Sequence, residues 1–482
     1  MTKYWETIIG LEIHAQLNTT SKLFSRSATR FNKEVNTQVS FFDAAMPGTL
    51  PVINKQAIML ALKASILLNG KINKISHFDR KNYFYPDSPQ GYQISQFFYP
   101  IMTNGYLSIN SIEGSPLLVK INRIHIEQDA GRSIYQSNNP NTYIDLNRAG
   151  IPLIEIVTDP NFRNPADVVT FLKNLRQLLK FCGICNGNLE NGSLRCDANI
   201  SIRKKTDHNY GTRVEIKNLN SFKNIYNAIS SESRRQIALL KNNKTILQET
   251  RAYDLSNNRT KTLRNKENLQ DYRYFPDPDL LPLKISDTLI NKVKLSIPEL
   301  PAQKRARYIQ DMDLPDHYAD IIVSEKEIAD FFDQVVTKIS PKLAAVWLIC
   351  ELFGRLNKKK ISFTNIPIST QNFISLLESI EKKSISQKMA KTALDEMVFF
   401  HKDIDVILKK HKFVQISNRS VIAKSIEKIL QQHEAKIQQY KNGKTKLFGF
   451  LIGQIMKASQ GHLNPTIVKE ILQTKLDNYA LS

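Results

Sequence analysis

Polar and apolar side chains alternate residue by residue in several short segments within the first 220 residues of this chain. The longest such segment spans residues 195–203, where alternate positions hold Arg195, Asp197, Asn199, Ser201 and Arg203. A two-residue repeat is that of a β-strand, because successive side chains point to opposite faces of the sheet. This part of the chain is therefore predicted to form a sheet with one apolar and one polar face.

The polar positions carry an unusual set of side chains. Glu12 and His14 stand two residues apart, His125 and Glu127 repeat that step, and Glu215 and Lys217 follow it again. A solvated strand face in a Lys-rich protein is expected to carry mainly Lys, Thr and Ser. Carboxylates, imidazoles and guanidinium groups together favour a metal or phosphate site, whereas an antiparallel sheet with one hydrated face gives the same alternation without any chemistry. Both interpretations remain open from the pattern alone.

Length and charge narrow the class of protein. At 482 residues the chain exceeds one ordinary core, which predicts two or three domains. Its 67 Lys and Arg residues against 45 Asp and Glu residues give a formal charge of +22. Such an excess attracts polyanions, and a nucleic acid is the natural partner. A coding bias toward Lys is the alternative, since the basic residues are spread along the chain.

The sequence signals for helices and strands divide the chain into three regions and predict an α+β protein. Residues 1–295 are expected to form a mixed, strand-rich domain, with a helix that begins at Asn164 and Pro165. Prolines at 298 and 301 mark a boundary, after which strand signals nearly vanish. Residues 296–405 are predicted to form a helical domain that includes helices over 343–356 and 387–400. Residues 406–482 are predicted to form a second helical domain.

Cysteines and apolar runs argue against several classes of protein. Four cysteines are too few for a disulfide framework in a chain of this length, which fits a reducing cytosol. Cys182 and Cys185 form a CxxC at the end of a helical stretch, where we expect small buried residues and not a redox pair. Glu12 interrupts the N-terminal apolar run, so we expect no signal peptide. No apolar run in the sequence approaches the length of a membrane span, so we expect none.

One carboxylate is especially informative. Glu155 has two apolar neighbours on each side, in the run Leu153-Ile154-Glu155-Ile156-Val157. Removing a charge from water is unfavourable, so this residue requires a cation. That cation is either Mg²⁺, which takes carboxylate oxygens as ligands, or an internal Arg or Lys. For a metal site, the other candidate ligands are Glu12, His14 and Glu127.

Two segments combine cations with aromatic residues. Arg80 and Lys81 lie next to Tyr83, Phe84 and Tyr85, and residues 271–279 contain a similar mixture. This composition suits a phosphate-bearing ligand with a base that can stack, although aromatic packing beside surface cations gives the same pattern. Residues 443–445, Gly-Lys-Thr, resemble part of a P-loop, but Gln438 stands where its first glycine would be, so we reject that motif.

Eight ordered blocks resemble the family of B subunits of tRNA-dependent amidotransferases, over nearly the whole chain. They are IGLEIHAQL at 9–17, DRKNYFYPDSPQGYQISQ at 79–96, HIEQDAG at 125–131, DLNRAGIPLIEIV at 145–157, GSLRCDANISIR at 192–203, EIKNLNSF at 215–222, DYRYFPDPDL at 271–280 and GFLIGQIMKAS at 449–459. The resemblance implies a cradle-like catalytic domain followed by helical domains. It implies a component of an enzyme that converts Glu-tRNA(Gln) to Gln-tRNA(Gln), Asp-tRNA(Asn) to Asn-tRNA(Asn), or both.

The resemblance also implies partners and cofactors. An amidase (A) subunit releases ammonia from glutamine or asparagine, and a small C subunit clamps the complex. In the cytoplasm, the family's B subunits hold the mischarged tRNA and activate its side-chain carboxylate with ATP and Mg²⁺, after which ammonia displaces phosphate. Phosphorylation gives a poor electrophile a good leaving group, so the site must mainly position substrates and neutralise charge. A non-catalytic tRNA-binding scaffold is the competing hypothesis.

By this resemblance we assign the candidate residues. The predicted catalytic Mg²⁺ ligands are Glu12, His14, Glu127 and Glu155. The residues predicted to contact nucleotide phosphates or to line the same cavity are Arg80, Lys81, Arg195, Asp197, Asn199, Glu215 and Lys217. The predicted tRNA contacts in the tail are Lys441, Lys444, Lys446 and Lys457. Some relatives carry a zinc clip, but residues 24–27 lack its cysteines, so we expect no structural zinc and expect Phe41 and Phe42 to pack there instead.

Overall fold

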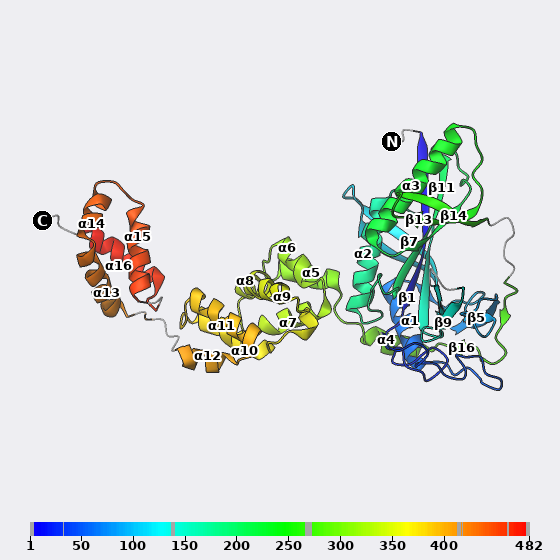
Figure 1. Ribbon diagram of the computed structural model, residues 1–482, viewed down its shortest axis with the longest axis horizontal. Coiled ribbons are helices and arrows are strands. Elements are labelled where there is room, and N and C mark those ends of the chain that lie inside the picture. The colour runs from blue at the N-terminus through cyan, green and yellow to red at the C-terminus, as the bar shows by residue number, and fades with distance from the viewer. Residues whose placement is uncertain are drawn as a thin grey trace. The chain divides into compact units, whose positions relative to one another are not determined.

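The computed structural model describes residues 4–31, 33–135, 140–265, 272–411, 416, 418–459 and 462–478 (Figure 1). The chain forms two compact units, Met1–Pro301 and Ala302–Ser482. The first contains the named strands and the second is helical, which confirms the α+β class. The boundary between the units falls at the end of the proline-containing segment. A further division of the helical unit near residue 405 stays a prediction.

A nine-stranded sheet forms the centre of the first unit. Its neighbouring strands pair antiparallel, except that β12 and β13 run parallel. In spatial order the strands are β14 (Arg259–Asn265), β13 (Glu249–Asp254), β12 (Val214–Leu219), β11 (Leu194–Lys204), β1 (Trp5–Gln16), β10 (Pro152–Thr158), β7 (Pro116–Gln128), β6 (Met102–Asn110) and β2 (Lys71–Ile72).

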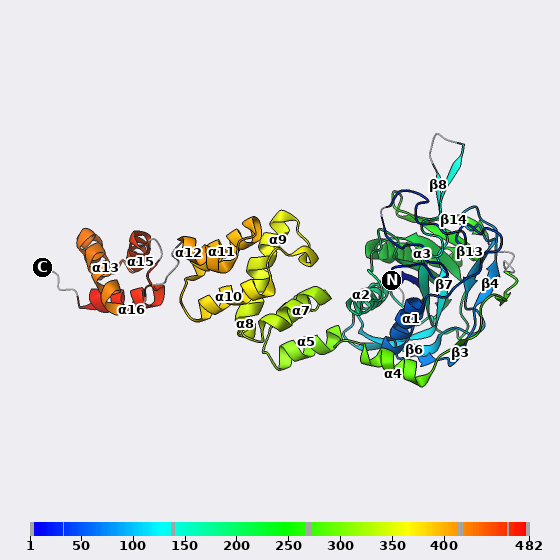
Figure 2. The same cartoon turned by 90° about the horizontal axis from the view of Figure 1, so that it is seen from below.

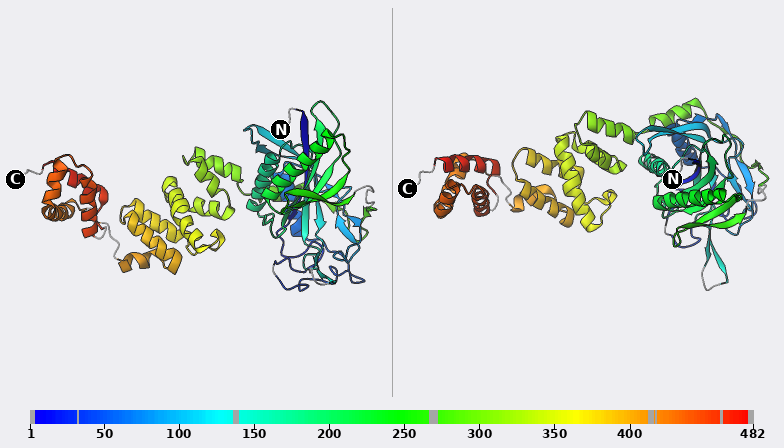
Figure 3. Two further views of the ribbon diagram at one scale, coloured as in Figure 1. Left: turned by 45° about the horizontal axis from the view of Figure 1, so that its top comes forward. Right: turned by 90° about the horizontal axis from the view of Figure 1, so that it is seen from above.

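Helices cover the apolar face of this sheet. Helices α1 (Lys55–Leu67), α2 (Pro165–Phe181) and α3 (Phe222–Lys241) pack against the strands, and α2 and α3 lie side by side (Figures 2 and 3). The strand residues on this face are apolar and buried, among them Ile9, Leu11, Ile13, Ile126, Ile154, Ile156 and Ile200. Helix α2 begins as predicted, because the Asn164 side chain accepts a hydrogen bond from the amide of Asp167. The opposite sheet face is left for polar side chains.

A smaller sheet lies against that polar face. It joins β15 (Phe275–Pro276), β4 (Asp79–Asn82) and β5 (Tyr92–Ser95). Gln96, which follows β5, accepts a hydrogen bond from the amide of Ile126, and Gln93 donates one to the carbonyl of Gln128. The remaining short strands are β3 (Ile75–Ser76) with β16 (Leu283–Lys284), and β8 (Arg132–Tyr135) with β9 (Thr142–Asp145). The small sheet therefore covers part of the polar face of the nine-stranded sheet, which would otherwise be open to solvent.

Short helices make up the rest of the described chain. Helix α4 (Asp287–Leu295) ends the first unit. The second unit contains α5 (Pro301–Gln310), α6 (Asp316–Ile322), α7 (Lys326–Val335), α8 (Pro341–Val346), α9 (Phe353–Lys359), α10 (Thr370–Glu381), α11 (Gln387–Phe400) and α12 (Ile404–His411), with a π-helical turn at Trp347–Leu352 and a 3₁₀ turn at Phe363–Asn365. The helix expected over 343–356 is thus continuous but passes through a π-helical turn, and the helix expected over 387–400 is confirmed.

The last four helices have a core of their own. They are α13 (Arg419–Gln432), α14 (Glu434–Lys441), α15 (Leu447–Ala458) and α16 (Pro465–Asp477), and they bury Ile422, Ile426, Leu451, Ile455 and Val468 against one another. In the described part of the chain, none of the helices has both the length and the apolar character to cross a membrane.

Candidate active site

Strand register aligns four polar side chains in a row across the polar face. His125 on β7 pairs with Glu155 on β10, Glu155 pairs with His14 on β1, and His14 pairs with Arg195 on β11. These residues come from four strands that are far apart in the sequence. The pairing of antiparallel strands places their side chains within reach of one another. The alternation seen in the sequence thus produces one continuous polar row.

His14, Glu127 and Glu155 converge within this row, and we call these three residues the His14 cluster. His14 Nε2 lies 3.2 Å from Glu155 Oε2 and 3.6 Å from Glu127 Oε1. One ligand atom from each of the three residues lies within 4.8 Å of the other two. Three of the four predicted metal ligands are therefore brought together.

His125 contacts the same two carboxylates from β7. Its Nε2 lies 3.3 Å from Glu155 Oε2 and 3.6 Å from Glu127 Oε2. It was not assigned a role from the sequence, although it stands two residues before Glu127 in the same alternating strand. That step of two was the available signal.

The two imidazoles and the two carboxylates stabilise one another's charged forms although they are buried. Burial opposes the charged form of His125, but the charges and hydrogen bonds of Glu155 and Glu127 outweigh it and raise its pKa to about 9. The pKa of His14 is raised for the same reason, mainly by Glu155. Burial would raise the pKa of Glu155, yet the two imidazoles hold it well below its usual range. The pKa of Glu127 is lowered in the same way, so both carboxylates are held in their anionic form.

The donor set of the His14 cluster fits a divalent cation. Two carboxylates and one imidazole supply oxygen-rich coordination, and Mg²⁺ or Mn²⁺ commonly completes such a set with water and phosphate oxygens. In this structure the imidazoles supply the positive charge that the carboxylates require. Nδ1 of the buried His125 has no hydrogen-bond partner within the described residues.

Glu12 does not join the His14 cluster, contrary to its assignment as a fourth ligand. It pairs in register with Asp197 and with Val157, two residues along β1 from His14. Its Oε1 accepts a hydrogen bond of 2.9 Å from Asn199 Nδ2. It does line a cavity of about 250 Å³ together with His14, Glu127 and Glu155.

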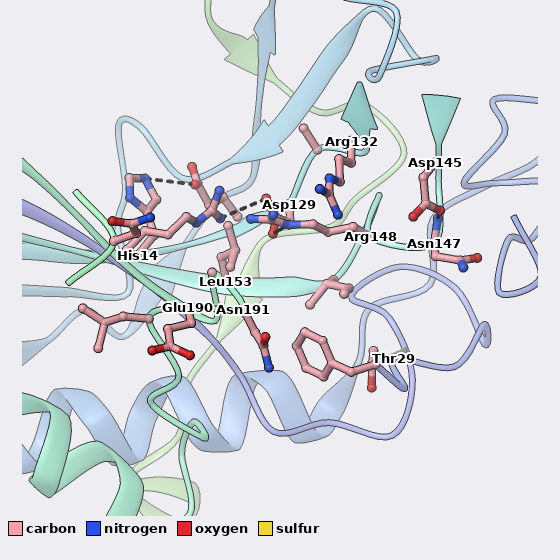
Figure 4. A pocket seen from close by; sticks show the side chains of 18 of the residues that line it. His14, Thr29, Asp129, Arg132, Asp145, Asn147, Arg148, Leu153, Glu190 and Asn191 are labelled. Atoms are coloured by element: carbon pink, nitrogen blue, oxygen red, sulfur yellow. Dashed lines mark hydrogen bonds and ion pairs between the residues drawn. The ribbon is translucent and has the colours of Figure 1, made fainter. Parts of the chain in front are cut away.

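A larger cavity, of about 1100 Å³, adjoins the His14 cluster (Figure 4). We call it the large cavity. Its described lining includes His14, Glu127 and Glu155, and adds the cations Arg30, Lys33, Lys81, Arg132, Arg148, Arg195 and Lys217. The space exceeds what one metal ion needs and is of the size that ligand sites for small molecules occupy.

The predicted lining residues on β11 and β12 form a second ion network. Lys217 Nζ lies 2.9 Å from Asp197 Oδ2 and 3.2 Å from Glu215 Oε1. Burial opposes the charge of Lys217, but these two carboxylates raise its pKa above the usual range. Asp197 and Lys217 line the large cavity, and Glu215 lines the smaller one. The side chain of Asn199 instead donates a hydrogen bond to Glu12.

The side chains of Arg80 and Lys81 point in opposite directions, because adjacent residues of the strand β4 face opposite sides of the sheet. Lys81 lines both cavities. Arg80 is not among their described lining residues: its Nε donates to Asp277 Oδ2 and a terminal nitrogen donates to Asp279 Oδ2, both at 2.9 Å. Its prediction as a phosphate contact is therefore not supported, since two acids nearly 200 residues away in sequence already bind it.

An ion pair stabilises the segment around residues 22–43, where some relatives carry the zinc clip. Lys22, fully buried, donates a hydrogen bond of 3.0 Å to Asp43 Oδ2. Phe42 packs against Phe24, but Phe41 is 75 % exposed, so the predicted packing holds for Phe42 and is wrong for Phe41. The absence of structural zinc stays a prediction.

The predicted tRNA-contacting lysines lie on the tail helices and the loop between them. Lys441 ends α14, Lys444 and Lys446 lie in the loop that follows, and Lys457 lies near the end of α15. All four side chains belong to exposed residues. Their role with tRNA stays a prediction.

The cysteines behave as expected from the sequence. Cys182, Cys185 and Cys196 are buried. Burial raises the pKa of Cys185 to about 11, which disfavours the reactive thiolate.

Comparisons with known proteins agree over the whole chain. Residues 7–291 match the family model for the GatB/GatE catalytic domain, and residues 330–476 match that for the GatB domain. The chain is similar to proteins named as the B subunit of aspartyl/glutamyl-tRNA(Asn/Gln) amidotransferase. That of Rickettsia felis is 48% identical over 477 residues, covering 99% of each chain, and that of Wolbachia pipientis wMel is 47% identical over 479 residues, covering 99% of this chain and 100% of the relative. The chain therefore belongs to the GatB family of amidotransferase B subunits.

Proposed function

We propose that this chain is the B subunit of a glutamine-dependent aminoacyl-tRNA amidotransferase. It takes up Glu-tRNA(Gln), Asp-tRNA(Asn) or both, activates the side-chain carboxylate with ATP, and presents it to ammonia. It works in the cytoplasm with an amidase (A) subunit and a small C subunit. The names of relatives that are 47–48% identical to this chain over 99% of its length support this proposal. The formal charge of +22 suits a polyanionic substrate.

The observation that carries the proposal is the His14 cluster beside the large cavity. Phosphoryl transfer to a carboxylate brings two anions together, so the site must supply positive charge and hold both reactants. His14, Glu127 and Glu155 are the residues that would hold Mg²⁺, which when bound neutralises phosphate charge.

The chain's own groups perform the remaining tasks. Lys81, Arg195 and Lys217 surround the cavity with fixed cations that can bind phosphate oxygens. The small sheet covers Glu127 on one side: Ser95 Oγ lies 3.4 Å from Glu127 Oε2, and Glu127 is 4 % exposed. Exclusion of water strengthens each of these electrostatic contacts.

Glu155→Gln tests the proposal in the complex reconstituted with the A and C partner subunits. We expect phosphate release that depends on mischarged tRNA to fall by about 100-fold or more, because the variant removes the charge of a metal ligand. Amide formation should fall in parallel, while tRNA binding is retained. Unchanged turnover would contradict the proposal and favour a non-catalytic tRNA-binding scaffold, in which the cluster forms ion pairs alone.

Glu249→Gln is the matched control. Glu249 is also a buried carboxylate paired with two cations, Arg251 and Arg235, at 2.7 and 3.3 Å. It lies on β13 and is not one of the described residues that line the large cavity. Its substitution should affect stability without a selective loss of phosphate release.

A further inference from the structure

His125 contacts the His14 cluster without belonging to it. Its side chain is 7 % exposed, against 19 % for that of His14. The three residues of the cluster line the large cavity, whereas His125 is not among the described residues that line it. It borders the smaller cavity instead, which has a volume of about 250 Å³. A reactant in the large cavity would therefore contact the cluster and not His125.

Glu127 and Glu155 are close enough to repel each other. One oxygen of each carboxylate lies within 4.8 Å of the other. Burial and the negative charge of Glu155 both act to raise the pKa of Glu127, and the contacts with His125 and His14 lower it. Two anions held at this spacing require a group that contacts both of them.

His125 contacts both carboxylates with one nitrogen. Its Nε2 is 3.3 Å from Glu155 Oε2 and 3.6 Å from Glu127 Oε2. Ser95 Oγ also donates to Glu127 Oε2, at 3.4 Å. The other oxygen of Glu127, Oε1, lies 3.6 Å from His14 Nε2. The contacts to Oε2 therefore fix the orientation of this carboxylate and leave Oε1 directed toward His14.

The second nitrogen of the His125 ring makes no such contact. Nδ1 is buried and has no hydrogen-bond partner within the described residues. A buried histidine that supports the fold alone is expected to pair both nitrogens, because unpaired buried polar atoms are unfavourable. In His125 the nitrogen that is paired contacts two predicted metal ligands, so its described polar contacts are all with the cluster.

The fold holds the backbone of His125 in place on both sides of β7. On one side His125 pairs in register with Glu155 on β10. On the other side β6 begins only at Met102, and beyond it Gln96 Oε1 accepts a hydrogen bond of 3.1 Å from the amide of Ile126. The ring is therefore attached to a fixed point opposite Glu155.

We propose that His125 is a positioning residue that holds the carboxylates of Glu127 and Glu155 at the spacing at which they bind the divalent cation. This inference rests on the proposed function and extends it to a residue that was not assigned from the sequence. Loss of a group that orients a metal ligand typically lowers metal affinity by about 10–100-fold. The feature that matters is a hydrogen-bond donor at the position of Nε2.

The test measures the Mn²⁺ affinity of the reconstituted complex by electron paramagnetic resonance for three substitutions of His125. His125→Leu removes the donor and should weaken Mn²⁺ binding by about tenfold or more. His125→Gln places an amide nitrogen near the position of Nε2 and should restore most of that affinity. His125→Asn places its amide nitrogen near the position of Nδ1 and should bind as weakly as His125→Leu does.

Gln236→Leu is the matched control. Gln236 is also fully buried and donates a hydrogen bond of 2.9 Å to a buried carboxylate, that of Glu232 on α3. It is not among the described residues that line the large or the smaller cavity. Its substitution should leave Mn²⁺ affinity unchanged, and calorimetry of each variant measures any loss of stability separately.

The outcomes are separable. Wild-type affinity in His125→Leu, or an equal loss in His125→Gln and His125→Leu, would overturn the inference. Tighter Mn²⁺ binding by His125→Leu would show that the imidazole acts as a charge that opposes the cation, and would overturn it as well. If His125→Leu fails to fold, the difference between His125→Gln and His125→Asn decides the question. A wild-type complex that binds no Mn²⁺ would overturn the metal site of the proposed function, and this inference with it.

Discussion

The ion pair between Lys22 and Asp43 should be a main support of the segment that precedes α1. Lys22 is fully buried, and Asp43 also accepts hydrogen bonds from the amide of Ser40 at 2.8 Å and from Ser25 Oγ at 3.2 Å. Asp43→Asn preserves shape but leaves a buried ammonium without its counter-ion. Breaking a buried pair in this way costs about 3–5 kcal/mol.

This cost translates into a measurable shift in melting temperature. At about 2.1 cal/mol/K per residue, a unit of about 300 residues has an unfolding entropy of about 0.63 kcal/mol/K, so the midpoint should fall by about 5–8 °C. Differential scanning calorimetry of the N-terminal transition measures it. The double variant with Lys22→Met and Asp43→Ala leaves no unpaired charge and should recover at least part of the loss.

The fall in the unfolding midpoint caused by Asp43→Asn, which we call the deficit, should also depend on pH. Burial lowers the pKa of Lys22 despite the charge of Asp43. At a pH below its lowered folded pKa, Lys22 is charged in both states, and burying that charge reduces the free energy of unfolding. This penalty diminishes as the pH rises from the folded pKa toward the unfolded pKa of about 10.4, because Lys22 then becomes neutral in the folded protein. Removing Asp43 lowers the folded pKa further, so the deficit of Asp43→Asn should shrink between pH 7 and about pH 9.5. A midpoint equal to that of wild type, or a deficit that grows with pH, would refute this reasoning.

Two further predictions follow from the site and the tail. Glu12→Gln should weaken Mn²⁺ binding, measured by titration calorimetry, by less than Glu155→Gln does, since Glu12 is hydrogen-bonded to Asn199 outside the His14 cluster; an equal loss would place Glu12 among the ligands. The double variant of Lys444→Ala and Lys446→Ala should reduce the slope of log tRNA affinity against log salt by about 1.4–1.8, if both lysines contact phosphate; an unchanged slope would show that they do not.

Local sequence patterns predicted the elements well. The alternation at 195–203 predicted a strand, and Asn164 with Pro165 predicted the start of α2, because strand faces and helix caps depend on neighbouring residues. The change from strands to helices after residue 301 was equally visible.

Cross-strand register was the information that the sequence did not carry. Glu12 and Glu155 are equivalent by alternation, and the pairing of β1 with β10 alone decides that Glu155 lies opposite His14. The ion pairs of Arg80 could not be predicted from the sequence, because its partners, Asp277 and Asp279, are nearly 200 residues away. Asp129 continues the step of two from His125 and Glu127, but the two arginines that it binds come from separate segments, so its position between them required the fold.

Mn²⁺ binding to the reconstituted complex tests the central claim most directly, because Mn²⁺ is a paramagnetic substitute for Mg²⁺ that electron paramagnetic resonance detects when bound. We predict one site in the wild type, an affinity at least about tenfold lower in Glu155→Gln and in Glu127→Gln, and wild-type affinity in Glu249→Gln. Equal binding by all four proteins would contradict a metal site at His14, Glu127 and Glu155.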